Sequence, residues 1–113
     1  MHATIYKIVP SRLWSMAVAT GSFEGSPLDV ADGFIHFSTA AQVRDTAAKH
    51  FAGQADLLLV AVPTAGLGDA LKWEPSRGGD LFPHLYGPLA VAVVRWVNPL
   101  PIGHDGRHAF PEL

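Results

Sequence analysis

Leu57-Leu58-Leu59-Val60-Ala61-Val62 is an unbroken apolar stretch that ends at Pro63. A strand with one face in water alternates apolar and polar residues, whereas a strand covered on both faces can be apolar throughout. We therefore expect residues 57–62 to form the central strand of a sheet that is covered on both sides.

The chain before this stretch alternates between strand and helix patterns. The residues from Ile5 to Val9 predict a first strand, which Pro10 stops, and residues 11–19 predict a helix. The apolar face of that helix would consist of Leu13, Trp14, Ala17 and Val18.

A second strand and helix are expected in the middle of the chain. Residues 34–37 predict a short strand, preceded by a turn at Asp32-Gly33. The helix would run from Thr39 to about Phe51, because Thr39 and Gln42 have the spacing of a capping box.

The second half of the chain has strand patterns. Residues 70–74 predict a strand, and residues 89–97 predict a long one that is rich in valine. The residues between them resemble a loop, with glycine and proline at intervals. Two helices in the first half and several strands in the second predict an α+β fold, a single domain over residues 1–113 with two main helices and a mixed sheet.

The composition excludes several classes of function. Of the 113 residues, 49% are hydrophobic and 16% are charged, which is typical of one packed domain. The net charge is -2 and neither sign forms a run, so we expect no nucleic-acid partner. The absence of cysteine excludes disulfides and thiol chemistry. With no apolar stretch of ~18 residues and no signal-peptide pattern, a cytoplasmic protein without a membrane span is expected.

Polar and aromatic groups are concentrated in two stretches. The first, residues 32–39, contains His36 at the end of a predicted strand, directly before a helix start. A histidine there could bind an anion or a ribose hydroxyl, or it could be a core histidine bonded to a backbone carbonyl. Ser38 could be a nucleophile beside His36, although a helix cap is its commoner role.

The second stretch, residues 73–87, combines an acid, a guanidinium, an imidazole and a phenol, which are Glu74, Arg77, His84 and Tyr86. Gly78-Gly79 would let the backbone approach a ligand closely. Alternatively, Glu74 pairs with Arg77, His84 caps a loop, and the aromatic rings fill the core. His36 and His84 could join one acid at a metal ion, but their spacing does not require it, and no metal site is predicted.

Two motifs in these stretches resemble a known family. Gly-Phe-Ile-His-Phe-Ser-Thr at residues 33–39 and Phe-Pro-His-Leu-Tyr-Gly at residues 82–87 are similar to the bacterial domain-of-unknown-function family 952. The likeness covers nearly the whole chain. It implies a distant similarity to ADP-ribosyltransferase catalytic domains, including the RNA 2′-phosphotransferases, which hold NAD in a cleft of a split, mixed β-sheet.

The resemblance also implies roles for individual residues. His36, Glu74 and Tyr86 would be catalytic: His36 would contact a ribose, Tyr86 would stack on nicotinamide, and Glu74 would orient the attacked ribose. The residues that bind the cofactor would be His36, Ser38, Arg77, Gly79, Phe82, His84 and Tyr86. In the transferases the catalytic glutamate usually comes later in the chain, and residues 91–97 contain no acid.

Three functions follow as hypotheses. The first is an NAD-dependent ADP-ribosyl-type transferase or NAD hydrolase. The second is a non-catalytic cleft that binds a nucleotide or another phosphorylated metabolite as its small-molecule ligand. The third is a homodimeric interaction domain anchored by Trp14, Trp73 or Trp96. The sequence fixes neither the ligand nor the oligomeric state.

Overall fold

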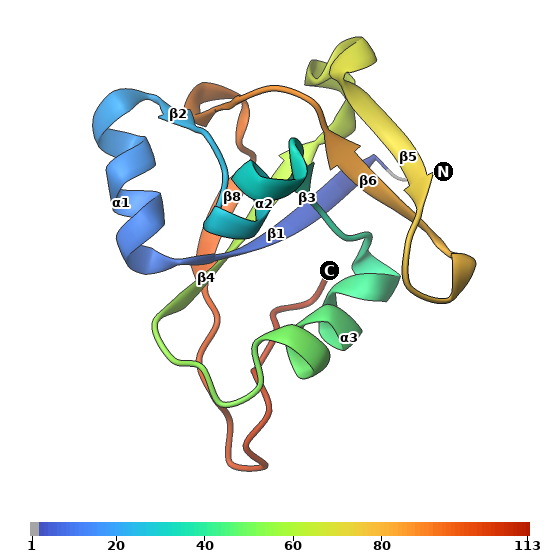
Figure 1. Ribbon diagram of the computed structural model, residues 1–113. Coiled ribbons are helices and arrows are strands. Elements are labelled where there is room, and N and C mark those ends of the chain that lie inside the picture. Colours follow the sequence, from blue (N-terminus) through green and yellow to red (C-terminus); the bar gives the residue numbers. More distant parts are fainter. Residues whose placement is uncertain (1–2) are drawn as a thin grey trace.

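A computed structural model describes residues 3–113 (Figure 1). In chain order the elements are β1 (Thr4–Pro10), α1 (Ser11–Thr20), β2 (Ser22–Phe23), α2 (Pro27–Asp32), β3 (Ile35–His36), α3 (Ala40–His50), β4 (Leu57–Pro63), β5 (Leu71–Pro75), β6 (Leu81–Leu85), β7 (Leu89–Ala90) and β8 (Trp96–Pro99). Short 3₁₀ turns lie at Thr64–Gly66, Gly68–Ala70, Arg77–Gly79 and Val91–Val93. The fold is a small α+β fold with antiparallel sheets.

The largest hydrogen-bonded unit is a three-stranded sheet in the order β1-β4-β8. Its middle strand is β4, and the side chains of β4 alternate between two apolar clusters. One cluster contains Val60 and Val62, and the other contains Leu59 and Ala61. The prediction of a central strand covered on both faces is therefore confirmed.

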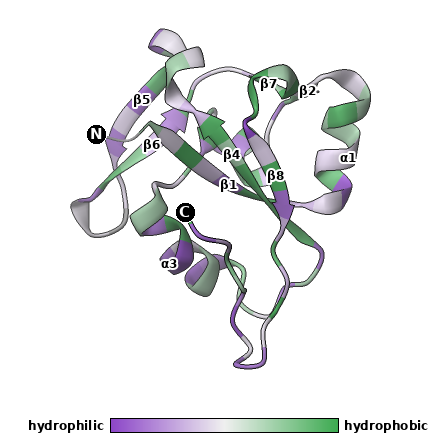
Figure 2. Cartoon of the chain, turned by 180° about the vertical axis from the view of Figure 1, so that it is seen from behind, coloured by the Kyte–Doolittle hydropathy of each residue, from purple (hydrophilic) through white to green (hydrophobic). Residues whose placement is uncertain are grey.

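The two predicted helices are present and cover opposite faces of this sheet (Figures 1 and 2). Trp14 and Ala17 of α1 belong to one apolar cluster, and Val43 and Ala47 of α3 belong to the other. The Thr39 side chain caps α3, as its spacing from Gln42 predicts. One expectation for α1 is wrong, because Val18 is 56% exposed.

A second sheet has the order β3-β6-β5. Ile35 lies opposite Leu85 in it, and both side chains are buried in the core. The next pair along these strands is His36 opposite His84. Because neighbouring residues of a strand point to opposite faces, the two histidines share the face that is turned away from this core.

Several expectations about the sheets are wrong. All the strand pairs described in residues 3–113 are antiparallel, so the sheet is not mixed. The expected loop at residues 75–87 contains β6, which forms a hairpin with β5. The expected long strand at residues 89–97 is divided into β7, a 3₁₀ turn and β8. An unbroken apolar run has no period of its own, so it does not reveal where the chain passes from one sheet to the next.

The expectation of two helices is also wrong, because α2 forms a third between them. Ser26 caps it by accepting from the Asp29 backbone, and the Asp29 carboxylate accepts from the Ser26 backbone. Pro27 occupies the first turn, where a missing N–H costs nothing. In residues 3–113, no helix is both long and apolar enough to cross a membrane.

Candidate functional site

The pairing of β3 with β6 brings the two polar stretches together. His36 and His84 are direct cross-strand neighbours, with ring centroids 5.5 Å apart and planes at 67°. Each ring has its Nδ1 against a carboxylate from a different element, Asp29 for His36 and Glu74 for His84. The site is therefore built from two histidine–carboxylate pairs that face one another.

The first pair lies in a group of charges centred on a buried carboxylate, here called the Asp29 cluster: Lys7, Asp29, Asp32 and His36. His36 Nδ1 is 2.6 Å from Asp29 Oδ1, and the His36 backbone N–H donates to the same oxygen over 3.1 Å. Lys7 Nζ lies 3.2 Å from Asp29 Oδ2. The cluster joins three elements: β1 supplies Lys7, α2 supplies both aspartates, and β3 supplies His36.

These contacts decide the ionisation of Asp29, which is only 2% exposed. Burial by itself would raise the pKa of the carboxyl. Hydrogen bonds from His36, the charge of Lys7 and the backbone N–H of Ser26 outweigh it and hold the pKa of Asp29 well below its usual value. Burial lowers the pKa of Lys7, an effect that the contact with Asp29 opposes.

His36 has a second carboxylate at its other ring nitrogen. Nε2 lies 3.0 Å from Asp32 Oδ2, four residues back in the chain. An ionised carboxylate only accepts hydrogen bonds, so both contacts are satisfied at once when each ring nitrogen carries a hydrogen. The geometry around His36 therefore favours the imidazolium form.

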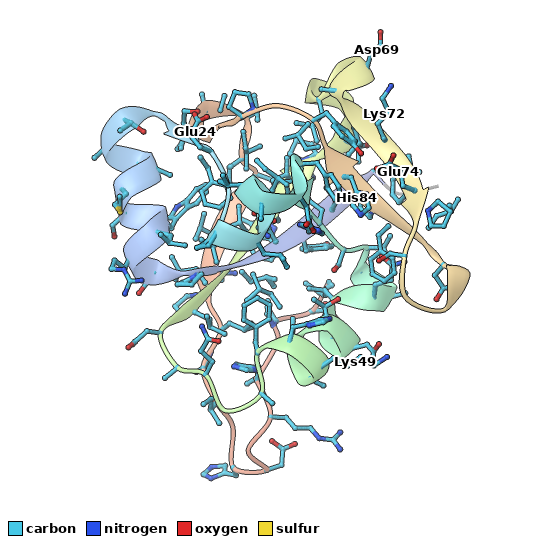
Figure 3. The ribbon with its side chains drawn as sticks, viewed as in Figure 1. Glu24, Lys49, Asp69, Lys72, Glu74 and His84 are labelled. Atoms are coloured by element: carbon cyan, nitrogen blue, oxygen red, sulfur yellow. The ribbon has the colours of Figure 1, made fainter. Side chains whose placement is uncertain are left out.

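The second pair belongs to the Glu74 cluster: Glu74, His84 and Tyr86. Glu74 Oε1 is 2.7 Å from His84 Nδ1, and it accepts from the Tyr86 hydroxyl over 2.8 Å. Figure 3 shows Glu74 and His84 side by side on β5 and β6. The bond from His84, and then the bond from Tyr86, lower the pKa of Glu74. The same bond to Glu74 raises the pKa of Tyr86.

The ring of Phe34 connects the two clusters. Its centroid is 4.1 Å from that of His84, in a stacked arrangement, and 4.5 Å from that of His36. The Tyr86 ring is 5.1 Å away. Phe34 therefore fixes the relative placement of both imidazoles.

A cavity of about 600 Å³ opens beside the histidine pair. Ordinary small-molecule sites have volumes of this order. Among the described residues of its wall, the groups that can carry positive charge outnumber the acids: they are Lys7, Arg12, His36, His50 and His84, against the single acid Asp29. Within residues 3–113, no group of three or more acids and histidines has the geometry of a metal site.

The predicted site residues differ in where they lie relative to the cavity. His36, Ser38, Phe82 and His84 line the cavity. Glu74 and Tyr86 do not line it, and they are connected to it through His84. Gly79 lies in the β5–β6 turn, where its N–H donates to the Ser76 carbonyl and not to the cavity. The side chain of Arg77 lies outside the described residues.

Some alternatives to a functional role are wrong in detail. Ser38 does not cap α3, because its hydroxyl lies 3.0 Å from that of Thr46. His36 has its Nδ1 against the Asp29 carboxylate and not against a backbone carbonyl. His84 has its Nδ1 against the Glu74 carboxylate and does not cap a loop. Among the tryptophans, Trp14 is buried in the core, Trp96 is half-buried near Tyr6, and Trp73 is 38% exposed.

Three residues of the site were not predicted from the sequence: Lys7, Asp29 and Phe34. Ser26-Pro27-Leu28-Asp29 has the spacing of a capping box with proline in the first turn, which is a recognisable helix start. Lys7 lies in a strand between apolar neighbours, and a buried lysine needs an acidic partner. Nothing in the sequence indicates that the partner is Asp29, because 22 positions separate the two residues.

The molecule is thus a small α+β protein with a histidine–carboxylate cavity. The chain belongs to the family described as "Protein of unknown function (DUF952)", whose model matches residues 8–97.

Solved structures of one relative are similar to this chain. A crystal structure of protein CC0527 from Caulobacter crescentus has a TM-score of 0.90 and 52% identity, and the match covers 94% of this chain and 93% of that one. A solution NMR structure of CC0527 has a TM-score of 0.85 and 52% identity, over 93% and 90% of the two chains. No curated protein matches the chain. These matches show the family and the α+β fold, and the likeness to ADP-ribosyltransferases stays a prediction.

Proposed function

We propose that the cavity binds a small phosphorylated ligand of the nucleotide class. The observation that carries the proposal is a buried lysine in the wall of a cavity with two imidazoles. Lys7 has three N–H donors, and the two oxygens of Asp29 can accept two of them. A third donor in a poorly hydrated wall suits a phosphate oxygen, since charge-assisted hydrogen bonds are the strong ones.

The other residues of the cavity wall favour a nucleotide over a small inorganic anion as the ligand. Apolar and aromatic residues line much of the cavity, among them Tyr6, Phe51 and Phe82. Stacking of a base on an aromatic ring contributes ~1–3 kcal/mol and tolerates different bases. The proposal includes the cytoplasmic location predicted from the sequence, where nucleotides are abundant.

Binding can be measured by calorimetry with AMP, ADP-ribose, NAD and adenosine. The phosphorylated compounds should bind, and adenosine should bind at least ~10-fold more weakly, since the loss of one charged contact costs ~1.5–3 kcal/mol. Arg12→Gln removes a charge from the cavity wall and should weaken the binding of AMP. Arg95→Gln is the matched control, because Arg95 is exposed and does not line the cavity. Equal binding of AMP and adenosine, or no binding by any of the four, would contradict the proposal.

A second candidate is NAD cleavage, favoured by the Glu74 carboxylate. Glu74 lies behind His84 of the cavity wall, bonds from His84 and Tyr86 lower its pKa, and an anion there can stabilise the positive charge that develops on a ribose as nicotinamide leaves. The test is release of nicotinamide from NAD by the wild type and by Glu74→Gln. Turnover that Glu74→Gln abolishes while NAD still binds would support this candidate. Absence of turnover in the wild type would eliminate NAD cleavage as a function of the cavity.

A further inference from the structure

We infer that His84 and His36 form a general base and general acid pair for cleavage of a phosphodiester that has a neighbouring hydroxyl group. Short ribonucleotides are the substrate class. The inference rests on the proposed function, because the cavity must first bind a phosphorylated ligand. It differs from NAD cleavage, because the bond that breaks is between phosphorus and oxygen.

The two histidines have different surroundings, and general acid–base catalysis needs this difference. His84 donates from Nδ1 to Glu74 in its neutral form, and no partner for its Nε2 lies within the described part of the chain. That nitrogen is an acceptor on a side chain only 7% exposed in the cavity wall. His36 has a carboxylate at each nitrogen, so its geometry favours the protonated form. One imidazole is therefore set up to take a proton and the other to give one.

The spacing suits a single phosphoryl group. The ring centroids are 5.5 Å apart, and both rings line the same cavity. A catalytic hydrogen bond spans ~2.6–3.2 Å, so the two rings can reach the attacking and the leaving oxygen of one phosphorus atom. Lys7 is available to the non-bridging oxygens.

The step balances without metal, oxidant or added nucleophile. His84 Nε2 takes the proton of the substrate 2′-hydroxyl, whose oxygen forms a bond to phosphorus. The bond from phosphorus to the 5′-oxygen breaks, and His36 Nε2 gives that oxygen its proton. The products are a 2′,3′-cyclic phosphate and a 5′-hydroxyl. Asp32, whose side chain is 43% exposed, gives up its place at His36 Nε2 to the leaving oxygen.

Among the described residues, the charged groups in contact with the pair come from α2, β1 and β5, and Arg12 and His50 lie elsewhere in the cavity wall. Asp29 and Asp32 of α2 face His36, and Lys7 of β1 reaches it through Asp29. Glu74 faces His84 from β5. Lys72 lies opposite His84 in the strand register and acts on Glu74. Glu74 is a positioning residue, because it holds the tautomer of His84 without touching substrate.

The experiment uses the dinucleotides UpA, CpA, ApA and GpA with the wild-type protein, and the deoxy dinucleotide dTpdA as control. Chromatography separates the cyclic phosphate from the 5′-hydroxyl nucleoside. Cleavage of at least one ribonucleotide and not of dTpdA is expected. Because the rate needs one neutral and one protonated imidazole, its pH profile should be bell-shaped.

The variants attribute the activity to the pair. His84→Asn and His36→Asn should each lose at least ~100-fold in rate, as expected for a lost acid or base. Circular dichroism checks that they are folded, and His84→Gln and His36→Gln are the second choices. His108→Asn is the control, because His108 is bonded to the Gln54 carbonyl outside the cavity and should keep full activity. Glu74→Gln should keep part of the activity and move the acidic limb of the profile to lower pH.

The binding and cleavage measurements together distinguish failure of the acid–base inference from failure of the binding proposal. If AMP binds but no dinucleotide is cleaved, the acid–base inference is overturned and the binding proposal stands. Cleavage that persists in both histidine variants reveals a contaminating nuclease and overturns the inference as well. If neither binding nor cleavage is seen, both proposals fail.

Discussion

The Asp29 cluster and the Glu74 cluster repeat one chemical unit in two environments. In each, a carboxylate oxygen holds Nδ1 of a histidine at 2.6–2.7 Å. Asp29 is 2% exposed and also binds Lys7, whereas the Glu74 side chain is 38% exposed and contacts His84 and Tyr86. The first carboxylate lies among three elements, and the second lies on the surface of a hairpin.

Because of this difference in burial, we expect the two clusters to have different roles, one in folding stability and the other in the chemistry of the cavity. Removal of one partner from a buried ion pair leaves an uncompensated charge, so the Asp29 cluster should dominate the free energy of unfolding. An exposed pair contributes little to folding, because water and salt screen it. We therefore expect the Glu74 cluster to affect the reactivity of His84 and to leave the fold unchanged.

The largest expected effect comes from Asp29→Ala. It leaves Lys7 buried without its acid and removes a reciprocal cap from α2. The free energy of unfolding should fall by ~3–5 kcal/mol, measured by urea denaturation. Asp32→Ala removes the exposed carboxylate that contacts His36 Nε2, and it should lower the free energy of unfolding by at most ~1 kcal/mol. Similar losses in both variants would contradict the assignment of stability to the buried carboxylate.

Acid should weaken the fold through the same residue. The folded pKa of Asp29 lies below its ordinary value of 3.8, so the unfolded chain takes up a proton first as the pH falls. The stability from Asp29 is complete above this ordinary value and is lost as the pH falls through it toward the folded pKa. Urea midpoints of the wild type should stay level from pH 6 to about pH 5 and fall between about pH 4 and pH 2. The slope should be shallower in Asp29→Asn, and an unchanged slope there would refute the assignment.

The Phe34 ring should have an intermediate effect. Phe34→Ala removes contacts with both histidines and with Tyr86, and the ring is half-buried. A loss of ~1–3 kcal/mol in unfolding free energy is expected, together with weaker AMP binding. Phe34→Leu keeps the apolar volume without the ring. If Phe34→Leu binds AMP as the wild type does, the ring is not needed to place the imidazoles.

The smallest change in stability is expected for Glu74→Gln. The amide keeps an oxygen for the His84 N–H, and the side chain is partly in water. The midpoint of thermal unfolding should stay where it is in the wild type, while ligand binding or turnover is reduced. Loss of stability on the scale of Asp29→Ala would show that the two clusters do not differ as described.

The helices and strands could be predicted where a local sequence pattern marks them. The sheet of β1 and β4 follows from apolar runs, and α3 follows from Thr39 and Gln42. The strand β6 lies where the sequence patterns predict a loop, and Pro83 within it gives no strand signal, since proline in a middle strand is unusual. It is tolerated here because Pro83 contributes its carbonyl, which accepts from the Phe37 N–H.

The candidate site could be predicted only in part. The local motifs indicated His36, Glu74, His84 and Tyr86, because these residues are unusual in an apolar chain. The pairing of His36 with His84 depends on the register of β3 on β6, which no local pattern reveals. Asp29 was missed for the same reason, since its partner Lys7 comes from a strand far away in sequence.

The central claim is that both histidine–carboxylate pairs belong to one ligand site. The most direct measurement is an NMR titration with AMP that follows the imidazole resonances of His36 and His84, with His104 and His108 as internal references. We expect the resonances of His36 and His84 to shift together with a single dissociation constant while those of the references stay fixed. A folded protein in which neither resonance moves, or in which only one of them moves, would contradict it.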